Sequence, residues 1–95
     1  MAGYTVRVEL HVANQGNYLK LHAAMARAGY LNTVTADNGV VFRLPTAEYN
    51  LEQSPLTATQ VMQQVIAIAD SVKLGAWVLV TEAVRRAWQL APKPL

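Results

Sequence analysis

The sequence predicts an α+β domain in which two helices cover one face of a four-stranded antiparallel sheet. Three observations lead to this fold class: apolar residues alternate near the N-terminus, two later segments carry apolar residues at helical spacing, and a hairpin signal lies between them. The 95 residues are within the usual size of one domain. We therefore expect a single domain over residues 1–95, with residues 91–95 frayed.

The first two elements follow from a change of apolar period. Over residues 4–12 the apolar side chains occupy the even positions, which is the alternation of a half-buried strand. Residues 18–28 then carry apolar side chains at helical spacing. Gly29 directly follows them and is suited to a left-handed C-terminal cap.

The middle of the chain predicts a hairpin. Residues 31–36 and 40–44 flank Asp37-Asn38-Gly39, and Asn and Gly tolerate the positive φ angles of a tight turn. We expect the second of these strands to lie beside the first strand of the sheet. Pro45 ends regular pairing, and residues 46–53 are either an extension of the sheet edge or a loop over the sheet.

The last two elements are a helix and an apolar strand. Thr57 and Gln60 form a capping box, apolar residues continue at helical spacing to Val72, and Gly75 follows. Residues 76–80 are apolar without alternation, which indicates a central strand or one covered in a dimer. The order β-α-β-β-α-β is that of ferredoxin-like domains, whose right-handed crossovers place both helices on one side.

The composition limits the classes of function. Hydrophobic residues make up 53% and charged residues 15%, which excludes disorder and leaves a largely neutral surface that favours a homodimer. The net charge of +2 is too small to indicate nucleic-acid binding by itself. The absence of cysteine excludes disulfides and thiolate chemistry. Because no leader pattern or membrane-spanning run is present, we expect a cytoplasmic protein with no membrane insertion.

Alternation places several polar side chains on the sheet face away from the helices. These are Arg7, Glu9 and His11 of the first strand, beside Val41 and Arg43 of the predicted third strand. This face is either solvated or covered in a dimer, with an Arg–Glu pair across strands, or it recognises RNA phosphates and bases. Near the C-terminus, Arg85, Arg86 and Trp88 are either interface packing or the cationic and stacking groups of a single-strand RNA binder.

The two histidines are the remaining candidates for chemistry. His22 is either a partly buried helix residue or a general base or phosphate ligand. His11 and His22 fall on opposite sides of the predicted sheet, which argues against their acting as an acid–base pair within one protomer. Glu9 and His11 lack a third ligand at motif spacing, so we expect no metal. Nucleotide-binding, zincin and nucleophile-elbow motifs are absent, and no cofactor is expected.

Several short segments resemble the GhoS family. They are residues 4–10, Tyr18, Leu21-His22, Met25, Gly29-Tyr30, residues 44–45 and 47–51, residues 78–82, and Trp88. The resemblance implies a ferredoxin-like fold similar to that of the CRISPR-associated Cas2 nucleases. It also implies an antitoxin of a type V toxin–antitoxin pair that cleaves the toxin's messenger RNA.

The resemblance also suggests site residues. The family's functional positions are a basic residue on the first helix and an aromatic residue after the third strand, which correspond to His22 and Tyr49. His22 stands where the family has an arginine. Retained activity requires a cation that polarises an RNA phosphate, supplied by Arg7, Arg43 or His22.

Two hypotheses follow for the function. The first is an RNA-directed protein similar to GhoS, either a metal-independent endoribonuclease with His22 and Arg43 as catalytic residues or an RNA-binding relative. RNA would be bound by Arg7, His11, Tyr49, Arg85 and Arg86, and no DNA partner is expected. The second is a dimeric protein-interaction or regulatory domain of phage or plasmid origin. Convergence of Arg7, Arg43, Arg85 and Arg86 on one exposed surface favours the first.

Overall fold

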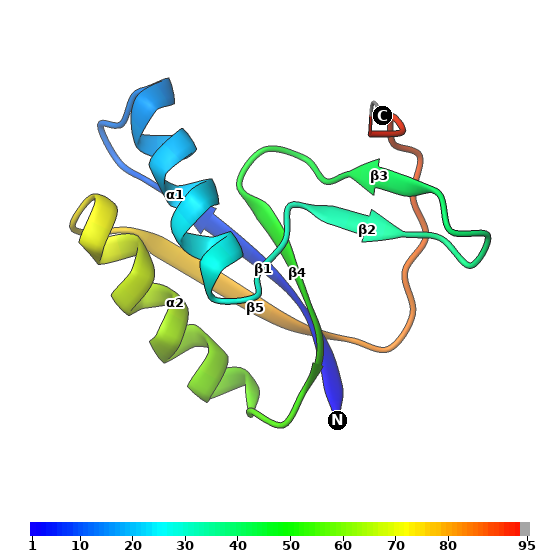
Figure 1. Cartoon of the computed structure of the whole chain (residues 1–95). Coiled ribbons are helices and arrows are strands. Elements are labelled where there is room, and N and C mark those ends of the chain that lie inside the picture. Colours follow the sequence, from blue (N-terminus) through cyan, green and yellow to red (C-terminus); the bar gives the residue numbers. More distant parts are fainter. Residues whose placement is uncertain (94–95) are drawn as a thin grey trace.

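Two helices pack on one face of a three-stranded sheet, and a small hairpin lies to one side (Figure 1). The computed structural model describes residues 1–93. The elements are β1 (Ala2–Glu9), α1 (Gln15–Arg27), β2 (Thr33–Thr35), β3 (Val41–Arg43), β4 (Glu48–Ser54), α2 (Ala58–Val72) and β5 (Trp77–Ala83). The α+β class with two helices is confirmed. The strands form antiparallel sheets of three and two strands, in the orders β4-β1-β5 and β2-β3, instead of one sheet of four.

The strand beside β1 is β4, so the prediction that residues 40–44 lie there was wrong. Those residues pair with β2 in the hairpin. The following segment, residues 46–53, was expected to be either an edge strand or a loop, and it contains most of β4, the strand that pairs with β1. Pro45 has no N–H to continue the ladder, and Ala47 turns the chain with a φ of 62°. Just before β2, Leu31 forms an isolated bridge to β4, through two backbone hydrogen bonds with Asn50 of 2.7 and 3.0 Å.

The start of α2 and the end of α1 lie at the signals found in the sequence. Thr57 and Gln60 form the predicted capping box of α2, and Asn14 with Asn17 forms a second one that starts α1 three residues earlier than expected. Gly29 has a φ of 93°, and the N–H groups of Gly29 and Tyr30 donate to the carbonyls of Ala26 and Met25. This pattern is a Schellman motif, which satisfies the last carbonyls of α1.

The core lies between the sheet and the helices. The even-numbered side chains from Tyr4 to Leu10, in β1 and directly after it, are at most 5% exposed. Across the interface, α1 and α2 bury a shared set of side chains: Leu21, Met25, Val61, Val65 and Ala69. The predicted alternation fails at Val12, which is 94% exposed, because β1 ends at Glu9 and the chain turns towards α1.

β5 is an edge strand and is not covered on both faces in the single chain. It pairs with β1 and with no other strand of the described residues. Trp77 and Leu79, on the face away from the helices, are 68% and 64% exposed. The expectation of a central strand was therefore wrong, because the uninterrupted apolar run conceals an alternation of half-buried and exposed positions.

Residues 84–93, here called the strap, run from β5 to the hairpin (Figure 1). The N–H of Arg43 donates to the carbonyl of Ala91, and the N–H of Lys93 donates to the carbonyl of Val41. Residues 91–93 are thus paired instead of frayed, and residues 94 and 95 lie outside the described part of the chain. No helix within residues 1–93 has both the length and the apolar character to cross a bilayer.

Replacing Leu21 with alanine should lower the free energy of unfolding by about 2–5 kcal/mol, because the side chain is fully buried between α1 and the sheet. The matched control is Leu19→Ala on the same helix, where the side chain is 61% exposed and the expected change is within about 0.5 kcal/mol. Urea unfolding followed by circular dichroism measures both. Equal losses in the two variants would contradict this packing of α1.

Candidate functional site

The sheet divides the predicted site residues between its two faces. In β1, even-numbered side chains face the helices and odd-numbered ones face away, so Arg7 and Glu9 lie on the open face. On that face Arg7 has Glu48 of β4 and Leu79 of β5 as its cross-strand neighbours. Tyr49 is opposite Val6 and therefore lies on the helix side.

His22 and Tyr49 are in direct contact between α1 and β4. The Nδ1 atom of His22 is 2.6 Å from the hydroxyl oxygen of Tyr49, and the ring centroids are 5.7 Å apart. Tyr49 is fully buried, so its side chain has no exposed surface for direct contact with a ligand. His22 itself is half-buried, which agrees with a structural helix histidine and also leaves part of its ring accessible.

Burial keeps both members of this pair neutral. It raises the pKa of Tyr49 well above the usual value, and the neighbouring Tyr18 phenol raises that pKa further. Burial also lowers the pKa of His22. The buried Tyr49 hydroxyl needs an acceptor, and within residues 1–93 the one in hydrogen-bonding range is Nδ1 of His22. Tyr49 therefore donates to Nδ1, and Nε2 of His22 carries the ring proton.

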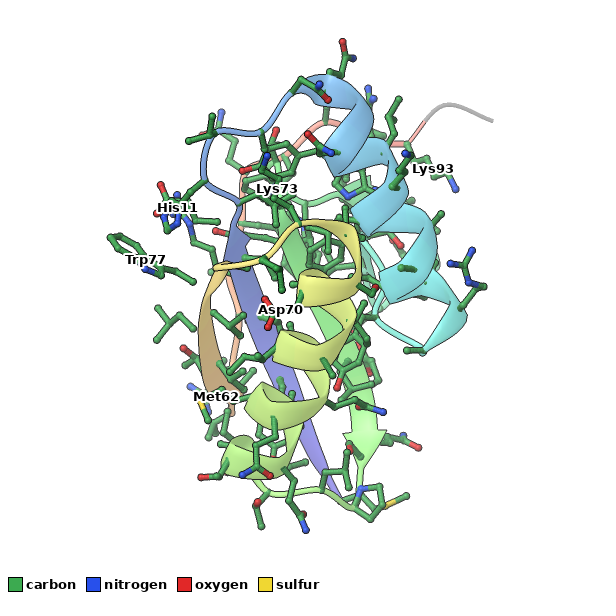
Figure 2. The ribbon with its side chains drawn as sticks, turned by 90° about the vertical axis from the view of Figure 1, so that its left-hand side faces the viewer. His11, Met62, Asp70, Lys73, Trp77 and Lys93 are labelled. Carbon is green, nitrogen blue, oxygen red and sulfur yellow. The ribbon has the colours of Figure 1, made fainter. Side chains whose placement is uncertain are left out.

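His11 lies on the opposite face, in a second cluster with Glu9 and Trp77. Its Nδ1 donates to the carbonyl of Gly75 at 3.0 Å, because a carbonyl can only accept. Nε2 is then directed to Glu9, 3.7 Å from Oε2. The Trp77 ring stands edge-on to His11 at 4.4 Å, and Figure 2 shows both side chains at the same side of the molecule. Arg7 lines the adjoining depression with Glu9 and Trp77.

The strap brings two further arginines to the open face. The Nε atom of Arg86 donates to Thr5 Oγ1 at 3.1 Å, and Thr5 is two positions from Arg7 on β1. Arg85, Arg86 and Trp88 line two cavities that flank this contact. Arg43, in contrast, is exposed on β3 of the hairpin and lines neither cavity. The four arginines therefore do not form one continuous patch.

The structure thus joins His22 with Tyr49, and His11 with Glu9, but it keeps the two histidines on different faces. Sequence reasoning missed Trp77, which contacts His11, and also Asp37 and Glu52, which line one of the two cavities with Arg86. No short motif connects these residues with their neighbours in the fold. Sequence reasoning also missed Tyr18, whose only signal was its place in the apolar stripe of α1. Within residues 1–93, no three His, Asp or Glu residues are close enough to hold a metal ion together.

We expect the free energy of unfolding to decrease as the pH falls from 7 to 5, partly because of His22. Its pKa is lower in the folded than in the unfolded chain, so the unfolded chain binds the proton more readily below about pH 6.5. His22→Gln should reduce this slope, whereas Lys20→Gln, on the same helix, should preserve it. Urea unfolding at several pH values measures the slopes, and equal slopes in all three proteins would contradict the assignment.

A comparison with known protein families finds a match that covers both helices and two strands of the larger sheet. A search of curated proteins found no match. The family model described as endoribonuclease GhoS matches residues 1–75 of the 95-residue chain. The matched part includes both His22 and Tyr49, and it ends before β5 and the strap. The protein that carries this histidine–tyrosine pair therefore belongs to the GhoS endoribonuclease family.

Proposed function

We propose that this protein is a cytoplasmic endoribonuclease antitoxin that cleaves the messenger RNA of its toxin. The observation that carries the proposal is the 2.6 Å hydrogen bond between His22 and Tyr49, which joins the two positions that the family resemblance implies. The bond fixes the ring of His22 and leaves Nε2–H free to donate. A fixed neutral donor on a partly accessible helix residue is suited to holding a phosphate oxygen.

The proposed reaction is attack of a ribose 2′-hydroxyl on the neighbouring phosphate. The 2′-O–P bond forms while the 5′-O–P bond breaks, solvent takes the 2′-hydroxyl proton, and the 5′-oxygen gains a proton from solvent. The products are a 2′,3′-cyclic phosphate and a 5′-hydroxyl end. Nε2–H of His22 donates to a non-bridging oxygen, and Arg43 supplies the cation that stabilises the developing charge. No step of this scheme uses a metal ion.

RNA binding is assigned to groups on both faces. Arg7, His11, Arg85 and Arg86 provide cationic or donor groups on the open face, whereas Tyr49 contributes by orienting His22. We also propose that the core is ferredoxin-like. Leu31 bridges to Asn50 at the outer edge of β4, so a rudimentary fourth strand would lie beside β4, β1 and β5 in that order.

The test is cleavage of a 5′-labelled single-stranded RNA containing all four bases, with and without EDTA. We expect cleavage that EDTA does not abolish, and a loss of about 10²-fold or more for His22→Ala and Arg43→Ala. Lys20→Ala, an exposed change on the same helix, is the matched control. Normal cleavage by His22→Ala together with loss in His11→Ala would move the chemistry to the open face. Absence of both cleavage and salt-dependent binding would reject an RNA function.

A second candidate, a dimeric protein-interaction domain, is favoured by the free edge of β5. Its seven residues contain no proline, lysine or bulge to discourage pairing with another strand. Trp77 and Leu79 add a large exposed apolar area beside that edge. Pairing of two β5 strands around a twofold axis would cover this area and is compatible with either function.

Leu79→Lys should therefore shift the protein from dimer to monomer, because it places a charge in the apolar strip next to the pairing edge. Leu74→Lys is the control, since Leu74 is 80% exposed but lies in the loop before β5. Size-exclusion chromatography coupled to light scattering measures the molar mass of each protein in solution. A monomeric wild type, or dimers in both variants, would contradict pairing through β5.

A further inference from the structure

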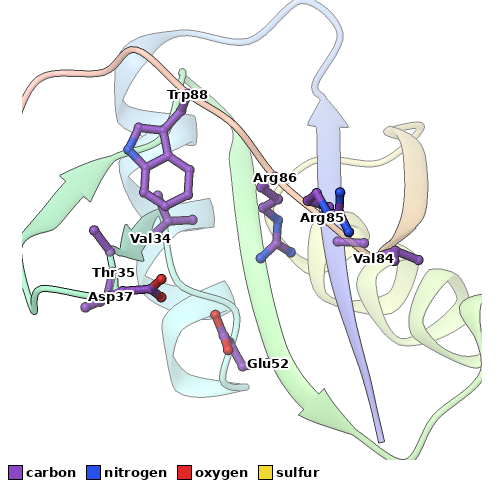
Figure 3. A pocket seen from close by; sticks show the side chains of 10 residues that line it. Val34, Thr35, Asp37, Glu52, Val84, Arg85, Arg86 and Trp88 are labelled. Atoms are coloured by element: carbon purple, nitrogen blue, oxygen red, sulfur yellow. The ribbon is translucent and has the colours of Figure 1, made fainter.

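Four accessible side chains meet on the open face of the sheet, where β1 ends. Glu9 and Trp77 are paired across β1 and β5, and His11 follows Glu9 by two residues. Trp77 is 68% exposed, and the side chains of Glu9 and His11 are 55% and 38% exposed. Arg7 lines a depression of about 180 Å³ with Glu9 and Trp77. These four residues, here called the open-face cluster, are all within reach of a ligand, unlike the side chains around the cavity of Figure 3, where Arg86 is committed to the strap.

The open-face cluster contains two hydrogen-bond acceptors that face each other. The carbonyl of Gly75 holds the Nδ1 proton of His11 at 3.0 Å, so Nε2 of the neutral ring has a lone pair. Nε2 is 3.7 Å from Oε2 of Glu9, which is longer than a hydrogen bond. Neither atom accepts a hydrogen bond from another group of residues 1–93. A ligand that carries a donor, such as a hydroxyl group, therefore fits between or beside them.

An aromatic ring and a free cation adjoin the two acceptors. The indole of Trp77 stands edge-on to His11 at 4.4 Å and keeps most of its surface exposed. Arg7 has no carboxylate oxygen of residues 1–93 within 4.0 Å, so its guanidinium is available to an anion. Exposed aromatic rings beside basic groups are typical of proteins that bind single-stranded nucleic acids. The depression is smaller than the roughly 300 Å³ of the smallest typical ligand pockets, so it holds one part of a longer molecule.

We propose that the open-face cluster binds one nucleotide of single-stranded RNA and distinguishes RNA from DNA. The base stacks on Trp77, and the ribose 2′-hydroxyl donates to Nε2 of His11 or to the carboxylate of Glu9. Arg7 contacts a neighbouring phosphate and offsets the charge of Glu9, which would otherwise repel it. The 2′-hydroxyl is the donor that every ribonucleotide carries, whereas only some bases carry an amino group.

This inference rests on the RNA-directed part of the proposed function and not on cleavage. His22 and Tyr49 lie on the helix side of the sheet, whereas the open-face cluster lies on the other side. The cluster therefore selects the sugar of the ligand and takes no part in the proposed reaction. Loss of either property should leave the other measurable.

Trp77 fluorescence tests this binding directly in a Trp88→Phe background, which leaves Trp77 as the only tryptophan. Hexa-adenylates built on ribose, deoxyribose and 2′-O-methylribose are titrated separately, so that the base is the same in all three strands. We expect saturable quenching by the ribose strand and affinities about tenfold weaker for the other two, because they lack the hydroxyl proton. Equal affinities for the three strands, or no quenching by any of them, would overturn the proposal.

Variants assign the contacts to individual side chains. Removing both acceptors in Glu9→Met/His11→Phe should bring the ribose and deoxyribose affinities to within about twofold of each other. Arg7→Gln should weaken all three strands about equally and reduce the salt dependence of binding. The matched control is Glu82→Met, which removes a carboxylate from β5 outside the depression and should keep the tenfold ribose preference. An unchanged preference in the double variant would contradict the assignment of the 2′-hydroxyl to this cluster.

The strands are recovered after each titration and separated on a gel, so cleavage is measured apart from binding. Ribose preference without cleavage would reject the ribonuclease and support this site, whereas cleavage without ribose preference in Trp77 quenching would reject this site alone. A Trp77 signal that follows the protein concentration and ignores RNA would show that a second copy of the chain covers the indole. That outcome would also overturn the proposal.

Discussion

The strict alternation of β1 is the constraint on which the rest of this structure depends. This strand lies at the centre of the sheet, and its even-numbered side chains form the floor of the core under both helices. A shift of one residue would exchange every side chain between the two faces. The same alternation places Arg7 and Glu9 away from the helices. One strand therefore determines which candidate groups share a face with His22 and which do not.

Local signals in the sequence were sufficient for the helices and the hairpin. The capping residues Thr57 and Gln60, the left-handed Gly29 and the Asn-Gly turn each act within a few residues, so their effect is visible without a partner strand. The choice of strand beside β1 depends instead on contacts between distant residues. Residues 40–44 read as a strand and residues 46–53 as either an edge extension or a loop. The turn at Pro45 and Ala47 then places β4 against β1.

Contacts between distant residues also limited what the sequence could predict about the candidate sites. His22 and Tyr49 were singled out separately through a family resemblance, and their contact depends on how α1 crosses β4. The separation of His22 from His11 did follow from alternation, because His22 belongs to a helix on the covered side. Asp37 and Glu52 were not recognised, since they line a cavity with Arg86 only because the strap returns across the open face to the hairpin. No residue spacing in the sequence indicates this path of the strap.

The position of the strap has a consequence for how this protein can diverge. Residues 76–93 contain β5 and the strap, and they form part of the open face without contributing either ring of the histidine–tyrosine pair. Substitutions there can alter what the molecule recognises or assembles with while the groups beneath α1 keep their geometry. Under the proposed function, recognition and chemistry lie in consecutive parts of one short chain, so selection can change one and retain the other.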